Sequence, residues 1–110
     1  MALKVTVGDL RHRVTIQATT AVQDSSGSYP ESWSDVATVW ARMRPISGRE
    51  FFAAEQAQSE VTHEVTIRFR RGISPANRLL FDGRVFDIGA VINADERNEW
   101  MTLYCIERRG

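Results

Sequence analysis

The sequence contains few side chains that could carry out covalent or metal chemistry. Its two histidines, His12 and His63, stand far apart in the chain, and each falls in line with the apolar positions of an alternating segment. Neither has a cysteine or a pair of carboxylates nearby in sequence, so the spacing does not predict a metal site. The single cysteine, Cys105, lies in a largely apolar run, where we expect a packed thiol rather than a nucleophile or ligand.

No other pattern in the chain is typical of an enzyme. No serine, histidine and aspartate arrangement stands out, and the glycines of the expected turns stand alone instead of forming a phosphate-binding loop. The carboxylates in or beside expected turns, where solvation and capping are the usual roles, are Asp82, Asp87, Asp95, Glu96 and Glu99. We therefore expect a protein that is not an enzyme and has no metal or cofactor.

Arginine is the side chain that remains for specific contacts. Of the 14 basic residues all but Lys4 are arginines, and 14 carboxylates bring the formal net charge to zero. Arginine forms planar, bidentate pairs and tolerates partial burial, so an arginine-rich surface suits contacts with protein as well as with phosphate. A composition bias of the genome would explain the same preference. Zero net charge does not by itself indicate a nucleic-acid-binding protein.

Residues 61–71 hold the pattern around which the other elements are organised. Apolar and polar residues alternate over about ten positions, which is the period of a half-buried β-strand. One set is Val61, His63, Val65, Ile67 and Phe69, and the other is Thr62, Glu64, Thr66, Arg68 and Arg70. We expect the first face to lie on a core and the arginine-bearing face to meet solvent or a partner.

Similar patterns predict the remaining elements. Alternation predicts strands over residues 11–19 and 36–46 and a last strand over residues 99–108. Residues 1–10 are expected to form an arm. Residues 22–35 are rich in turn-forming residues, so we expect them to form a long hairpin connection.

A compact hairpin is predicted over residues 78–88. Asp82-Gly83 is a favoured two-residue turn because both positions tolerate positive φ. The resulting register gives one apolar face, with Arg84 at its rim, that consists of Leu79, Phe81, Phe86 and Ile88.

These elements predict a mostly β fold, a small antiparallel barrel or sandwich of about six strands, in a single domain over residues 1–110. Residues 47–60 are expected to form a short helix or a projecting loop, because Ser47 and Glu50 have capping-box spacing and the apolar face that follows is weak. No apolar run approaches the roughly 20 residues that span a bilayer, and no signal peptide is recognised. We therefore expect no membrane contact and synthesis in a reducing cytoplasm.

Aromatic and arginine side chains share the second faces of three expected strands. Tryptophan and arginine are enriched at protein interfaces, and both faces of the last strand are largely apolar. We predict subunit-interface positions at Trp40, Arg42, Arg44, Arg68, Arg70, Trp100 and Tyr104. Two alternatives stay open. Trp40 packs under a loop of its own chain, or the last strand is a central one covered on both sides.

Short stretches along nearly the whole chain occur in an order typical of one known family. They include residues 8–14 and 39–41, then Phe81-Asp82-Gly83, Phe86-Asp87-Ile88 and the closing strand to Glu107. In order and spacing they resemble the small head–tail joining proteins of tailed bacteriophages, also called head-completion or stopper proteins. Gene transfer agents use related neck proteins.

The resemblance implies a β-barrel that assembles as a homo-oligomeric, dodecameric ring in the virion neck, after synthesis in the bacterial host cytoplasm. Such a ring sits between the portal and adaptor proteins and the tail terminator or tail tube. It seals the packaged DNA, which it contacts without reading sequence, and it docks the tail. In the family, the insertion between central strands faces the channel. The matching positions here are Ser47, Arg49, Glu50, Phe51, Phe52 and Gln56.

A second hypothesis is a small monomeric β-barrel that binds nucleic acid. Its motivation is a set of arginines expected near one tryptophan, namely Arg42, Arg44, Arg68, Arg70 and Arg71 beside Trp40. This hypothesis predicts an affinity for short DNA or RNA that falls with salt.

Overall fold

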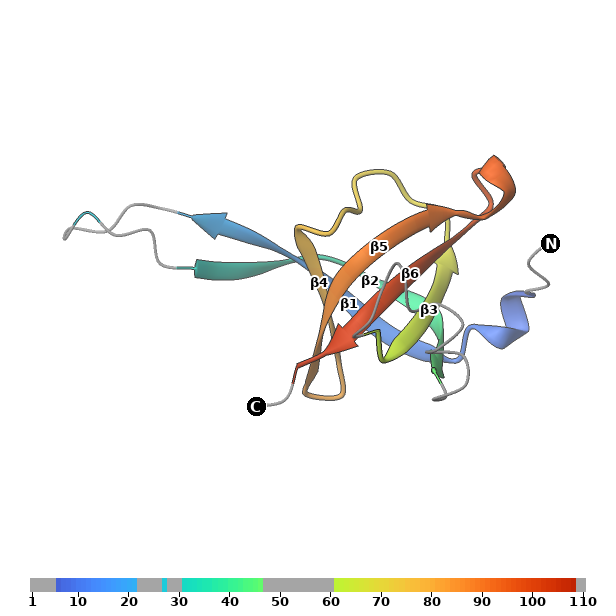
Figure 1. The fold of residues 1–110 in the computed structure, drawn as a ribbon, viewed down its shortest axis with the longest axis horizontal. Helices are drawn as coiled ribbons and strands as arrows, with labels where there is room; N and C mark the ends of the chain where they lie inside the picture. The colour runs from blue at the N-terminus through green and yellow to red at the C-terminus, as the bar shows by residue number, and fades with distance from the viewer. Residues whose placement is uncertain (1–5, 22–26, 28–30, 47–60, 109–110) are drawn as a thin grey trace.

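The computed structural model describes residues 6–21, 27, 31–46 and 61–108. Its elements are η1 (Val7–Asp9), β1 (His12–Ala21), β2 (Glu31–Pro45), β3 (His63–Arg68), β4 (Asn77–Phe81), β5 (Arg84–Asn93), η2 (Ala94–Glu96) and β6 (Trp100–Glu107). All strands pair antiparallel and close into one barrel in the order β1-β2-β3-β6-β5-β4 (Figure 1). The mostly β barrel of six strands predicted from the sequence is confirmed.

The helical content of the described residues is limited to the two short 3-10 turns. Neither is long and apolar enough to cross a membrane. The short helix or loop expected over residues 47–60 lies outside the described residues.

Alternation of side chains builds the core of the barrel. Val65 and Ile67 of β3 are buried, as predicted, and the paired strand β6 buries Met101, Leu103 and Cys105 beside them. The core is completed by Val14, Ile16, Ala41, Leu79, Phe86 and Ile88. Burying an aliphatic or phenyl side chain of this size contributes roughly 1.5–3 kcal/mol, so this interior is the main source of the barrel's stability.

Both histidines take part in this packing through their rings. His12 meets Phe81 edge-on with ring centroids 5.3 Å apart, and His63 meets Phe86 in the same way at 5.0 Å. Burial lowers the pKa of His63, because an imidazolium is poorly solvated there. Among the described residues, no group of three or more metal-ligating side chains forms.

Several strand boundaries differ from the predicted ones, and two of these differences have a clear cause in strand pairing. The second strand begins at Glu31 rather than at residue 36, because its polar first residues continue the ladder with β1 as far as the Ala21–Glu31 pair. This pairing overrides the turn-forming composition of residues 31–35. β3 ends at Arg68, earlier than predicted, because the backbone then leaves β2 and Phe69 N–H donates to the Glu99 carbonyl at 2.9 Å.

The hairpin between β4 and β5 forms as predicted. Asp82 and Gly83 have φ values of 52° and 76°, which a type I′ turn requires at both central positions. The predicted pairs Phe81–Arg84 and Leu79–Phe86 are both present. The exposed Arg84 lies over the ring of the buried Phe86, with its guanidinium carbon 5.0 Å from the ring centroid.

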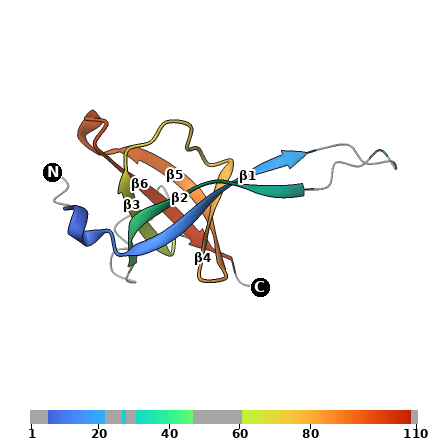
Figure 2. The same cartoon turned by 180° about the vertical axis from the view of Figure 1, so that it is seen from behind.

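β1 and β2 continue past the barrel as a two-stranded ribbon, which we define as residues 19–21 and 31–35. Pairing of β1 with β4 ends at Ala18–Asn77, whereas pairing of β1 with β2 continues. A register shift beside Ile16 and Gln17 marks a β-bulge where the ribbon leaves the barrel. The ribbon projects along the long axis of the molecule (Figures 1 and 2).

Three strands supply side chains that hold the base of this ribbon. Gln17 Nε2 donates to Asp35 Oδ1 at 2.9 Å, and Arg78 Nε donates to Gln17 Oε1 at 2.8 Å. The same guanidinium stacks on Trp33, with 4.1 Å between its carbon and the ring centroid. We call Gln17, Trp33, Asp35 and Arg78 the ribbon clamp.

The buried thiol of Cys105 yields a testable prediction. Burial raises its pKa to about 12, against 9.0 for a free thiol. In the native protein, Cys105 should resist a thiol reagent at pH 8 and should react fully after unfolding in guanidinium. Because the folded pKa is the higher one, the stability that this group contributes is present below pH 9 and is lost as the pH rises toward 12.

The control is Cys105→Ala, whose free energy of unfolding should fall less steeply over that pH range. Rapid stoichiometric labelling of the native protein would contradict the burial of the thiol.

Candidate functional site

The outward faces of β2, β3 and β6 bring together six of the seven predicted interface residues. Cross-strand pairing aligns Arg42 with Thr66 and Thr102, and it aligns Arg44 with Glu64 and Tyr104. A third row, in which Arg68 of β3 pairs with Trp100 of β6, lies beyond the last β2–β3 pair, Ala41–Ile67. We call this surface the arginine–aromatic face, and it consists of Trp40, Arg42, Arg44, Glu64, Thr66, Arg68, Trp100, Thr102 and Tyr104.

One carboxylate sits between two arginines on this face. Arg44 Nη2 lies 3.0 Å from Glu64 Oε2, and Arg42 Nη2 lies 3.5 Å from Glu64 Oε1. The Glu64 side chain is only 13% exposed, so this pairing is better shielded from solvent than a typical surface ion pair. Arg42 and Arg44 therefore have an ion-pair partner within their own chain.

The centre of the face is buried, whereas the sequence predicted that the arginine-bearing side of β3 would meet solvent or a partner. Thr66 is fully buried and Thr102 is 7% exposed. Among the described residues, the Thr66 Oγ1 atom and the Arg42 Nε atom have no hydrogen-bond partner. A buried polar group without a partner costs on the order of 1–3 kcal/mol, so the centre of this face carries a local energetic penalty.

Stacked arginine–tryptophan pairs occupy one end of the face. The Arg68 guanidinium carbon lies 5.5 Å from the Trp100 ring centroid, and that of Arg13 lies 5.1 Å from the Trp40 ring centroid. Trp40 remains 51% exposed. The alternative that it packs under a loop of its own chain therefore does not account for about half of its surface. Flat, amphipathic side chains of this kind are enriched at the centres of protein interfaces.

These arginines lack acidic partners within the described part of the chain. Arg84 pairs with Glu107, and Arg108 pairs with Asp87, both at 2.8 Å. No carboxylate lies within ion-pair distance of the remaining arginines on the β1–β3 side, which are Arg13, Arg68, Arg70 and Arg71. A chain of zero formal charge therefore presents a locally positive surface.

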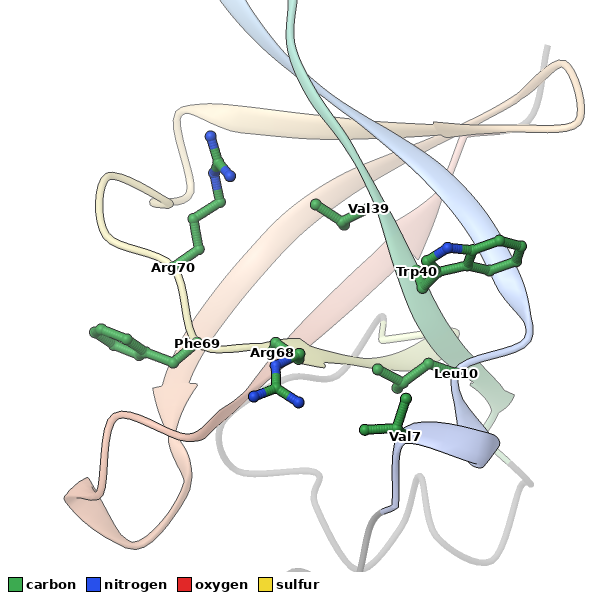
Figure 3. A pocket seen from close by; sticks show the side chains of 7 residues that line it. All are labelled: Val7, Leu10, Val39, Trp40, Arg68, Phe69 and Arg70. Carbon is green, nitrogen blue, oxygen red and sulfur yellow. The ribbon is translucent and has the colours of Figure 1, made fainter.

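A groove opens where β2 and β3 diverge after the Ala41–Ile67 pair. It has a volume of about 480 Å³, and the residues that line it are Val7, Leu10, Val39, Trp40, Arg68, Phe69 and Arg70 (Figure 3). Val39 and Phe69 pack against the core and form an apolar floor, while Trp40, Arg68 and Arg70 are exposed around it. Arg70, the seventh predicted residue, belongs to this groove rather than to the arginine–aromatic face.

Several residues of this site were not predicted from the sequence, among them Val7, Leu10 and Arg13. Val7 and Leu10 belong to the segment predicted to be an arm, and η1 places them against the groove. Arg13 stacks on Trp40 because the two residues are paired across β1 and β2. The predicted channel-facing residues lie outside the described residues, namely Ser47, Arg49, Glu50, Phe51, Phe52 and Gln56.

The site contains one phenol with a raised pKa, that of Tyr104, and no arrangement suited to proton transfer among its described residues. Burial raises the pKa of Tyr104, and the negative charge of the neighbouring Glu64 raises it further. Stacked guanidinium groups, an exposed indole and an apolar groove are suited to binding another surface.

Residues 5–108 match the sequence profile of the phage head completion protein family. Over 72 residues the chain is 36% identical to the head completion protein gp7 of Enterobacteria phage HK97. That match covers 66% of this chain and 64% of gp7, so it spans less than two thirds of the relative.

Two solved structures share the fold. Protein SF1141 from Shigella flexneri 2a superposes with a TM-score of 0.73 and 28% identity, covering 94% of this chain and 96% of that one. A chain in the virion of the native gene transfer agent particle superposes with a TM-score of 0.66 and 21% identity, covering 92% and 97%. At this level of identity, the likeness to the second structure shows a common fold alone.

The contact between Tyr104 and Glu64 can be tested by titration. In a Tyr29→Phe background, where Tyr104 is the remaining tyrosine, phenolate absorbance should show ionisation above the ordinary pKa of 10.0. Glu64→Gln removes the negative charge and should move the pKa part of the way back, because burial persists. An unchanged pKa in Glu64→Gln would contradict the electrostatic contribution.

Proposed function

Since the chain belongs to the phage head completion protein family, we propose that it is a structural virion component that forms a homo-oligomeric ring in the neck. In this proposal the ring lies between the portal and adaptor proteins and the tail terminator or tail tube. It seals the packaged DNA and gives the tail a docking surface. The observation that carries the proposal is the family match over residues 5–108.

The barrel would serve as the rigid body of each subunit. Its core is closed on itself, so the barrel itself does not need a partner to bury its main apolar set. The arginine–aromatic face and the groove beside it are the surfaces proposed to meet a neighbouring subunit. A head-to-tail contact of this kind closes into a ring when the rotation per subunit divides a full turn.

The insertion over residues 47–60 is proposed to face the channel, with contributions from Ser47, Arg49, Glu50, Phe51, Phe52 and Gln56. This part of the proposal rests on the family resemblance and on the weak apolar stripe of the segment. Contact with DNA in the lumen would be to phosphates and would not depend on base sequence. The chain would have no catalytic role.

Replacing Phe51 and Phe52 together by serine tests this assignment. The double variant should fold like the parent and unfold at a similar temperature, but particles that carry it should lose DNA or fail to join tails. A matched pair outside the proposed channel-facing set, Ala57→Ser and Gln58→Ser, changes side chains of the same segment without removing aromatic surface and should have little effect. Loss of the fold in the phenylalanine variant would show that these rings belong to the core.

A cryo-EM reconstruction of the particle neck tests the ring itself. We expect density for this barrel in a closed ring between the portal complex and the tail. A neck in which no density fits this chain would overturn the proposed function.

A monomeric nucleic-acid-binding barrel is the second candidate, and the positive surface around the groove favours it. Arg68, Arg70 and Arg71 lack acidic partners in the part of the chain that the structure describes, as this candidate requires, whereas Arg42 and Arg44 are engaged with Glu64. The monomer should then bind short single-stranded DNA at low salt, with an affinity that falls as salt rises. Absence of binding at low salt in a fluorescence anisotropy titration would eliminate this candidate.

A further inference from the structure

We propose that the groove between β2 and the residues after β3 receives the β1–β2 ribbon of a second copy of this chain. The inference rests on the proposed ring, for which it names the contact between neighbouring subunits. The receiving surface consists of Val39, Trp40, Arg68, Phe69 and Arg70.

The first observation is an open strand edge beside the groove. Within the described residues, β2 pairs with β3 only from Ala41 to Pro45, so β2 has a partner on one side alone between Glu31 and Trp40. Ile46 N–H donates to the Thr62 carbonyl. In the register of β2 and β3, this bond means that the even-numbered residues of β2 direct their backbone N–H and C=O groups toward the β3 side. Thr38 therefore turns its backbone groups toward the open edge, where an added strand could bind them.

The second observation is apolar surface around that edge. Three large hydrophobic side chains that are about half exposed or more lie on β2 or line the groove, namely Val7, Val36 and Trp40. Clustered exposure of this kind marks interaction sites in soluble proteins. Together with the apolar floor, it gives the groove a surface that a partner could cover.

The third observation identifies the occupant by charge. Residues 19–35 contain Asp24, Glu31 and Asp35 and no lysine or arginine, and Asp35 is the one of the three that is engaged in the ribbon clamp. The groove side contains Arg13, Arg68, Arg70 and Arg71, none of which has a carboxylate within ion-pair distance among the described residues. The acidic ribbon and the basic groove are complementary, which favours pairing and excludes contacts between two grooves.

The ribbon also lacks a third strand or a covering element within the described residues. Two-stranded ribbons are marginally stable in water, so a projecting ribbon gains stability when another surface covers it. It cannot fill the groove of its own copy. At about 3.3 Å per residue, Glu31 lies about 26 Å along β2 from Val39 at the groove. A ribbon that fills the groove must therefore come from another copy of the chain, and the proposed contact is head-to-tail.

Cysteine cross-linking tests this contact. The double variant Glu31→Cys with Arg70→Cys places one thiol on the ribbon and one on the groove, while the buried native Cys105 should stay unreactive. In purified particles, a short bismaleimide should convert the double variant into a ladder of covalent oligomers. Each single variant should give no ladder, because a chain with one new thiol can join at most one other.

A ladder supports the proposal. Monomers alone, or dimers alone, would overturn it, even if a neck reconstruction shows the ring and the proposed function stands. Absence of the wild-type chain from purified particles would instead refute the proposed function, so the two failures are distinguishable.

Charge reversal gives an independent readout. Arg70→Glu and Glu31→Arg should each reduce the number of copies per particle severalfold, and the double variant should restore it, because every interface would again join opposite charges. Arg97→Glu is the matched control, since it reverses an exposed arginine that does not line the groove. Equal losses in the single and double variants would overturn the contact.

Discussion

The unequal pairing of β2 is the constraint on which the rest of the structure depends. This strand of fifteen residues pairs with β1 along most of its length but with β3 over only five positions. Every strand of a closed barrel must find two neighbours, and β2 has both at the same residue only at Ala41, since residues 31–40 pair with β1 alone and residues 42–45 pair with β3 alone. The surplus of β2 produces the projecting ribbon, the open edge and the groove. The barrel thus buries its own core, but it leaves part of the edge of β2 unpaired at the surface.

Charge distribution follows the same division. Arginines near the C-terminal half of the barrel have acidic partners, as Arg84 has Glu107 and Arg108 has Asp87. Arginines beside the open edge stack instead on aromatic rings, as Arg13 does on Trp40. Formal neutrality of the whole chain therefore conceals a local excess of positive charge. Composition is a poor guide to such a surface, because ion pairs cancel charge only where partners meet.

Elements defined by local pattern could be predicted from the sequence. The Asp82-Gly83 turn specifies its own register, and the alternation around Val65 specifies which side of β3 faces the core. The start of β2 could not be predicted, because Ser32 and Ser34 enter a strand only through pairing with β1. The groove and the burial of Thr66 also escaped prediction, since they depend on where β2 and β3 part. The length of a long hairpin connection does not determine which residues of the two strands pair, so the Arg13–Trp40 pair could not be predicted either.

In the proposed ring, the ribbon clamp would affect how strongly neighbouring subunits bind each other. Gln17, Asp35 and Arg78 fix the heading of the ribbon while the subunit is still free. A ribbon whose orientation is already fixed loses little conformational entropy on binding, so more of the interaction free energy would remain as affinity. Loosening the clamp would leave the barrel intact, yet it would weaken the proposed contact between subunits. A few polar side chains at the base of the ribbon would thus contribute to the geometry of the proposed assembly.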